Sequence, residues 1–121
     1  MPVKKILIVD DSPSDRQSLL EKLAAHGFQC VTAETGEEAI AKSKSEHPDL
    51  ILMDVIMPGM NGYEATREIT RDERTRSIPV ILCTGKSQET DRLWGLRQGA
   101  RDYVTKPIDY RALIAKIAAI A

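Results

Sequence analysis

The feature that most constrains the fold of this chain is a fivefold alternation of short apolar runs with longer amphipathic stretches. The first, third and fourth runs are almost continuously apolar, which is typical of strands covered on both faces in a parallel sheet. The second and fifth runs are more mixed, which favours the two edge positions of that sheet. The five predicted strands are Ile6–Val9, Cys30–Ala33, Leu50–Met53, Val80–Cys83 and Tyr103–Thr105.

Each amphipathic stretch begins with a residue that can cap a helix, because its side-chain oxygen can accept a hydrogen bond from the first turn. The predicted caps are Ser12, Thr35, Asn61, Ser87 and Asp109. The first four helices are expected to end near Gly27, Ser45, Arg71 and Gly99. In the last helix, the predicted buried stripe is Leu113, Ile114, Ile117 and Ala118.

Strand–helix units that repeat with short connections favour right-handed crossovers and a parallel sheet with helices on both faces. A chain of 121 residues is long enough to bury one hydrophobic core. We therefore predict a single doubly wound α/β domain that occupies residues 1–121.

The charge balance narrows the class of partner. The 17 Lys and Arg residues are scattered among 18 Asp and Glu residues, so a nucleic acid or an anionic membrane surface is not an expected partner. No apolar stretch approaches the length of a membrane span or a signal-peptide core. Cys30 and Cys83 lie in apolar runs, where we interpret them as small core residues of a reducing compartment. We expect a cytoplasmic protein.

Chemically active side chains follow four of the five predicted strands. Asp10 and Asp11 follow the first strand, Asp54 follows the third. Thr84 and Lys106 follow the fourth and the fifth. The carboxyl ends of parallel strands meet at one edge of the sheet, where ligands bind in folds of this type. We therefore expect these five side chains to converge on one pocket.

Three adjacent carboxylates repel one another unless a cation joins them. Mg²⁺ fits, because it needs few protein oxygens and keeps its waters and phosphate partners. One carboxylate can then attack phosphorus, while the metal and a lysine neutralise the phosphoryl oxygens and a hydroxyl donates a hydrogen bond. The set is suited to forming a phospho-aspartate.

Each of these residues has an ordinary alternative role when it is considered alone. The pair Asp10-Asp11 can serve in helix capping, Asp54 can be a turn residue, Thr84 a strand residue and Lys106 a solvated loop charge. The convergence of all of them at strand ends favours the chemical interpretation.

Four segments of the chain stand out together: Ile6–Asp11, Leu52–Gly62, Ile78–Ile81 and Tyr103–Pro107. In combination they resemble the response-regulator receiver domains. The resemblance runs from about Lys4 to the C-terminus and implies a flavodoxin-like (βα)₅ fold with strand order 2-1-3-4-5. Within that family the chain is similar to stand-alone chemotaxis-type regulators, and residues 86–106 are similar to single-domain regulators of type IV pilus twitching systems.

The resemblance implies a role for each matching residue. Asp54 is the expected phospho-acceptor. Asp10 and Asp11 match the acidic pair that binds Mg²⁺, with Asp11 as a direct ligand. Ile56 is expected to lend its backbone carbonyl to the same ion.

The remaining matches concern the phosphoryl group and the switch. Lys106 matches the lysine that pairs with the phosphoryl group, and the bond between Lys106 and Pro107 is expected to be cis. Thr84 matches the hydroxyl that closes over that group. Tyr103 matches the aromatic residue that moves inward when Thr84 shifts.

The implied function is that of a stand-alone switch. A chemotaxis-type sensor histidine kinase would supply the phosphoryl group, and the chain would catalyse only its own phosphorylation and dephosphorylation. The face formed by the fourth helix, fifth strand and fifth helix would bind a downstream protein in chemotaxis-like or pilus motility signalling. No output domain is expected in residues 1–121.

Three other functions compete with this prediction. An aspartate-nucleophile phosphatase needs Asp-x-Asp after the first strand, whereas Asp10 and Asp11 are adjacent and Ser12 follows. A flavin carrier needs a Ser/Thr/Gly-rich phosphate loop at the same place, where the two acids would repel a phosphate. An interaction module that is not phosphorylated is the third alternative.

Trp94, in the predicted fourth helix, has two interpretations. It either packs between helices, which we favour, or contacts a partner. Gly95 beside it is expected to weaken the helix, since an interior glycine costs about 1 kcal/mol relative to alanine.

Overall fold

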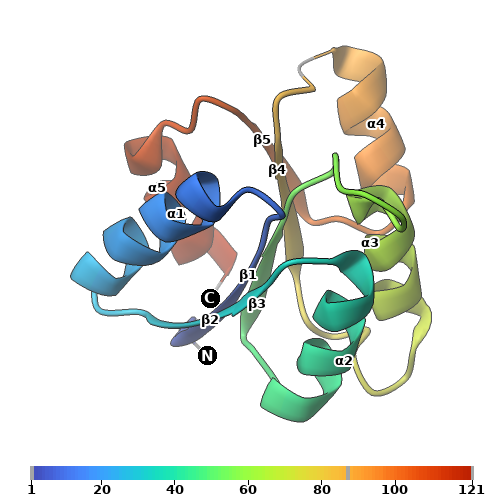
Figure 1. The fold of residues 1–121 in the computed structure, drawn as a ribbon, viewed down its shortest axis with the longest axis horizontal. Helices are drawn as coiled ribbons and strands as arrows, with labels where there is room; N and C mark the ends of the chain where they lie inside the picture. Colours follow the sequence, from blue (N-terminus) through green and yellow to red (C-terminus); the bar gives the residue numbers. More distant parts are fainter. Residues whose placement is uncertain (1, 87, 121) are drawn as a thin grey trace.

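A parallel sheet in the order β2-β1-β3-β4-β5 forms the centre of the protein (Figure 1), as predicted. The structure is a computed structural model that describes residues 2–86 and 88–120. In those residues the strands are β1 (Lys5–Val9), β2 (Gln29–Ala33), β3 (Leu50–Met53), β4 (Val80–Thr84) and β5 (Asp102–Thr105). The helices are α1 (Pro13–Ala25), α2 (Gly36–Glu46), α3 (Gly62–Arg71), α4 (Glu89–Arg97) and α5 (Tyr110–Ile120).

The helices cover both faces of the sheet. Helices α1 and α5 lie on one face, and α2, α3 and α4 lie on the other (Figure 1). Successive side chains of a strand point to opposite faces. In β1, Leu7 and Val9 therefore join the core under α2 and α3, whereas Ile6 and Ile8 join the core under α1 and α5. This double coverage explains why the inner strands read as continuous apolar runs.

Most of the predicted helix starts are present. The side chain of Asn61 accepts a hydrogen bond from Glu64 N at 2.9 Å, and the side chain of Glu64 accepts one from Asn61 N at 3.2 Å. Thr35 caps α2, because its side chain accepts a hydrogen bond from Glu38 N. The Glu38 side chain accepts a hydrogen bond from Glu34 N at 2.7 Å rather than from Thr35 N. Ser12 and Asp109 accept hydrogen bonds from the first turns of α1 and α5.

The predicted cap Ser87 lies outside the described residues. Within the described part of α4, the helix begins at Glu89, and Gln88 occupies the cap position without a side-chain capping hydrogen bond. The predicted burial of Ala118 is wrong: this residue is exposed. It lies one position beyond Ile117, and a step of one residue turns a helix by about a quarter of its circumference, away from the sheet.

Both cysteines are free thiols, Cys83 buried and Cys30 half-buried. Burial raises the pKa of the Cys83 thiol to about 12, so it stays protonated. In the stretches that the structure describes, we find no helix with both the length and the apolarity that a membrane crossing requires.

Candidate functional site

Strand pairing places two aspartates side by side at the edge of the sheet. Val9 and Met53 are partners in the parallel ladder of β1 and β3, so the residues that follow them, Asp10 and Asp54, emerge together. Asp54 N donates to Val9 O at 2.9 Å and holds the start of the β3–α3 loop against β1. The position of both acids therefore follows from the register of the two inner strands.

Three carboxylates gather at this edge. Asp10, Asp11 and Asp54 each offer an oxygen, and these oxygens lie within 4.8 Å of one another. Asp10 is 1% exposed and Asp54 is 7% exposed, whereas Asp11 is open to solvent. The structure thus brings together the three acids that the sequence indicated.

Lys106 reaches the cluster from the end of β5. Its Nζ lies 2.8 Å from Asp10 Oδ2, 3.0 Å from Asp15 Oδ2 and 3.7 Å from Asp54 Oδ2. Burial disfavours the ammonium ion, but hydrogen bonds to Asp10 and Asp15 and the charge of Asp54 outweigh it and raise the pKa of Lys106. The lysine is therefore firmly protonated.

Asp15 is a part of this site that the sequence did not reveal. It lies in the first turn of α1, where an acid is explained by the helix dipole alone. Only its distance from Lys106, which is remote in the sequence, shows that it belongs to the site.

The pKa of Asp54 is raised, whereas the pKa of an acid in an ordinary ion pair is lowered. Burial, and then the negative charge of Asp10, raise the pKa of Asp54 to about 6. The charge of Lys106 and the Val55 N–H, which donates to Asp54 Oδ1 at 2.9 Å, oppose this shift without cancelling it. The ionised form of Asp54 is thus disfavoured by its burial and by its neighbour Asp10, in spite of the nearby lysine.

Thr84 and Tyr103 meet at the backbone of Lys86. Thr84 is fully buried, and its Oγ1 accepts a hydrogen bond from Lys86 N at 3.4 Å. The Tyr103 ring is buried, and its hydroxyl donates to Lys86 O at 2.7 Å. The β4–α4 loop is therefore tied to the Thr84 hydroxyl and, through Tyr103, to β5.

Two glycines permit close approaches around the site. A Cβ on Gly62 would lie 2.1 Å from the carbonyl oxygen of Asp54, so only glycine lets α3 begin this close to β3. A Cβ on Gly95 would lie 2.5 Å from Leu82 Cδ1. Gly95 thus has a packing role between α4 and β4, in addition to the weakening of the helix expected from the sequence.

Three further features lie around the acidic cluster. The Lys106–Pro107 peptide bond is cis. The Ile56 side chain, two residues after Asp54, is 62% exposed. Lys86 Nζ lies 3.7 Å from Asp91 Oδ1, so its charge is directed to the first turn of α4.

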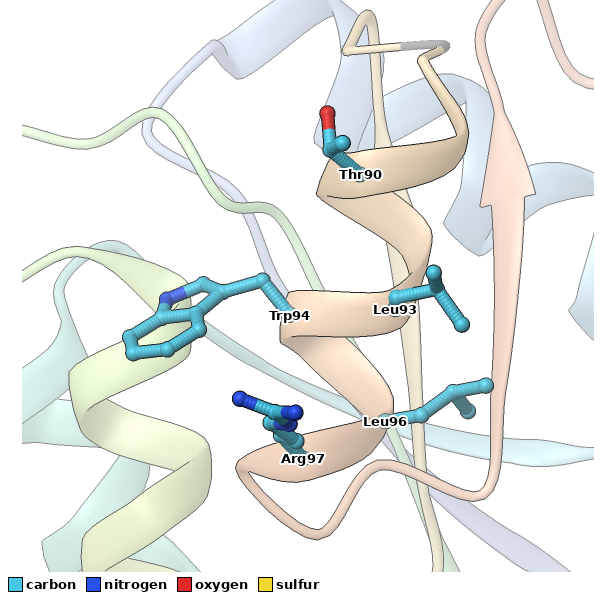
Figure 2. A pocket seen from close by; sticks show the side chains of 5 residues that line it. All are labelled: Thr90, Leu93, Trp94, Leu96 and Arg97. Carbon is cyan, nitrogen blue, oxygen red and sulfur yellow. The ribbon is translucent and has the colours of Figure 1, made fainter.

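The outer face of α4 exposes two large apolar side chains. Figure 2 shows Leu93 and Trp94 on the surface of this helix, and each is 50% exposed. The Trp94 side chain is therefore only half covered, and the other half is open to solvent. Gly95, the next residue, is the one that faces the core, and this turns Trp94 away from β4.

Comparison with known sequences gives a family and curated relatives. The family described as the response regulator receiver domain matches residues 6–118. Protein PilH of Pseudomonas aeruginosa is 52% identical over 116 residues, which are 96% of each chain. The phosphate regulon transcriptional regulatory protein PhoB of the same species is 42% identical over 97% of this chain, which spans about half (51%) of PhoB.

Solved structures agree with this result. The chemotaxis protein CheY4 of Vibrio cholerae has a TM-score of 0.91 at 29% identity and covers 98% of this chain and 99% of its own. CheY in the CheX-CheY-BeF3-Mg+2 complex of Borrelia burgdorferi has a TM-score of 0.90 at 28% identity and covers 97% and 88%. The family expected from the four sequence segments is confirmed: the chain belongs to the response regulator receiver domains.

Proposed function

We propose that this protein is a two-component switch that accepts a phosphoryl group on Asp54. One observation carries the proposal: a buried carboxylate lies beside two other acids and within 3.7 Å of the Lys106 ammonium. A carboxylate with this surplus of negative charge is poised to bind a cation and then an electrophilic phosphorus.

The donor set fits Mg²⁺, which takes hard oxygen ligands and keeps several waters. Asp10, Asp11 and Asp54 would hold it, together with the backbone carbonyl of Ile56. The raised pKa of Asp54 supports this choice, because a bound cation would offset both the burial of its charge and the repulsion by Asp10. When bound, the ion neutralises both the cluster and the phosphoryl oxygens. The Borrelia CheY complex, described with BeF3 and Mg+2, is consistent with this assignment.

The protein's own residues then have distinct tasks. An ionised Asp54 oxygen attacks phosphorus, a new O–P bond forms, and the bond between phosphorus and the donor's imidazole nitrogen breaks. Lys106 shifts toward a phosphoryl oxygen and offsets its charge. The Thr84 hydroxyl donates a hydrogen bond to another phosphoryl oxygen.

The contacts of Thr84 explain how this event would reach the surface. Its Oγ1 accepts a hydrogen bond from Lys86 N, and Lys86 O accepts one from the Tyr103 hydroxyl. A shift of Thr84 toward the phosphoryl group breaks the first contact and frees the β4–α4 loop to rearrange. The face of α4, β5 and α5 would respond, and its exposed Leu93 and Trp94 would contact the downstream protein.

The likeness to PilH over 96% of both chains, and the similarity of residues 86–106 to pilus regulators, support a stand-alone role in chemotaxis-like or pilus motility signalling. A sensor histidine kinase of the chemotaxis type would be the phosphoryl donor. We place the protein in the cytoplasm as a switch that occupies residues 1–121 and turns over no other substrate.

Beryllofluoride, which imitates a phosphoryl group on aspartate, tests this function. Fluorine NMR should show a bound signal that requires Mg²⁺ and that disappears in Asp54→Asn. Binding without Mg²⁺, or binding that survives Asp54→Asn, would contradict the assignment of the acceptor.

A further inference from the structure

We propose that Asp15 is a positioning residue that draws the Lys106 ammonium away from Asp54 and so opposes engagement of the phosphoryl group. The inference deepens the proposed function and rests on it. It assigns a role to an exposed acid of α1 that lies outside the acidic cluster.

The geometry shows a lysine shared among three acids. Lys106 Nζ is closer to Asp10, at 2.8 Å, and to Asp15, at 3.0 Å, than to Asp54, at 3.7 Å. The two shorter contacts are hydrogen bonds. Lys106 is therefore held at the side of the acceptor in this structure.

Asp15 is well anchored for this task. Its backbone N–H donates to Ser12 Oγ at 3.4 Å. The neighbouring Arg16 donates to Asp10 O at 2.8 Å and pairs with Glu34 at 3.2 Å. The first turn of α1 is thus tied to the end of β1, and the Asp15 carboxylate is kept near Lys106 without occupying the cluster.

The charges explain why Asp15 acts as a competitor. Asp10 and Asp54 belong to the cluster that would bind the metal, so a cation there weakens their attraction for Lys106. Asp15 lies outside that cluster and keeps its attraction. Once a phosphoryl group arrives on Asp54, Lys106 must exchange Asp15 for a phosphoryl oxygen.

The size of the effect follows from exposure. The Asp15 side chain is 50% exposed, and ion pairs with one exposed partner are weak and screened by salt. Loss of such a pair changes an equilibrium by roughly two- to fivefold. Asp15 would change the affinity of the site for a phosphoryl group by a small factor and leave its chemistry unchanged.

The test is the affinity for beryllofluoride in saturating Mg²⁺, measured by fluorine NMR. Asp15→Asn should tighten binding two- to fivefold at low salt, and the gain should fade in concentrated salt. Asp15→Glu, which keeps the charge, should stay close to the wild type. Glu21→Gln removes the same charge from an exposed position of α1 and should have no effect.

A double-mutant cycle separates positioning from the general effect of one negative charge. In a Lys106→Met background, Asp15→Asn should leave the affinity unchanged, because the residue through which Asp15 acts is gone. An unchanged or weaker affinity in Asp15→Asn overturns the proposal, as does a gain that persists in the Lys106→Met background. If the wild type itself binds no beryllofluoride, the proposed function fails and this inference fails with it.

Discussion

Replacing Asp54 by asparagine measures how far the buried carboxylate destabilises the metal-free protein. The pKa of Asp54 is about 6 in the folded protein against an ordinary value of 3.8. The folded state therefore binds more protons than the unfolded state between these values, and stability falls as the pH rises through about 6. An asparagine has no such titration, so the variant should gain on the wild type as the pH increases.

The magnitude follows from linkage. For this pair of pKa values, ionisation of Asp54 lowers the free energy of unfolding by about 1.4 kcal/mol between pH 5 and pH 8. Salt and the solvent that reaches the cluster reduce the expected change to about 1 kcal/mol. Mg²⁺ at saturation should remove the advantage of the variant, because it supplies the missing positive charge.

Urea unfolding in EDTA at both pH values is the assay. The free energy of unfolding of Asp54→Asn minus that of the wild type should be about 1 kcal/mol larger at pH 8 than at pH 5. Groups remote from the cluster cancel in this difference, whereas Asp10 and Lys106, whose charges act on Asp54, titrate as one coupled system with it. A difference that is equal at both pH values would refute the view that ionisation of Asp54 destabilises the metal-free protein.

Three further predictions follow from the site and from α4. Asp11→Ala should weaken Mg²⁺ binding in a calorimetric titration, while the melting temperature in EDTA stays equal or rises; a clear drop would make Asp11 a structural residue. Gly95→Ala should lower the free energy of unfolding by about 1 kcal/mol, because overpacking against Leu82 exceeds the gain in helix propensity; a more stable variant in urea would show that α4 has room to move away. Beryllofluoride in Mg²⁺ should change the emission of the half-exposed Trp94 more than Mg²⁺ alone, with Asp54→Asn as the control; unchanged emission with ligand bound would place the switch elsewhere.

The sheet and the acidic cluster were predictable from the sequence for one physical reason. Strands covered on both faces must be apolar throughout, so Ile6–Val9 and Leu50–Met53 stand out and the observed strands begin or end within one residue of the predictions. Once the strands are parallel, the residues after them must meet. The closeness of Asp10 and Asp54 follows from that rule without further information.

Contacts that depend on how helices sit on the sheet were not predictable. Asp15 and Lys106 meet because the loop after β5 lies beside the first turns of α1, and no local pattern encodes that placement. The exposure of Trp94 depends on Gly95 facing Leu82 at a distance that excludes a side chain. Such close packing is set by the fitted surfaces of two elements, which the sequence of one helix does not reveal.

Phosphorylation by acetyl phosphate in Mg²⁺, followed by intact-mass spectrometry, tests the central claim most directly. The account predicts one added phosphoryl group on the wild type, its absence in EDTA and its absence in Asp54→Asn. Borohydride reduction of the modified protein should place the label at Asp54. A phosphoryl group that remains in Asp54→Asn, or that maps to Asp10 or Asp11, would contradict the assignment of Asp54 as the acceptor.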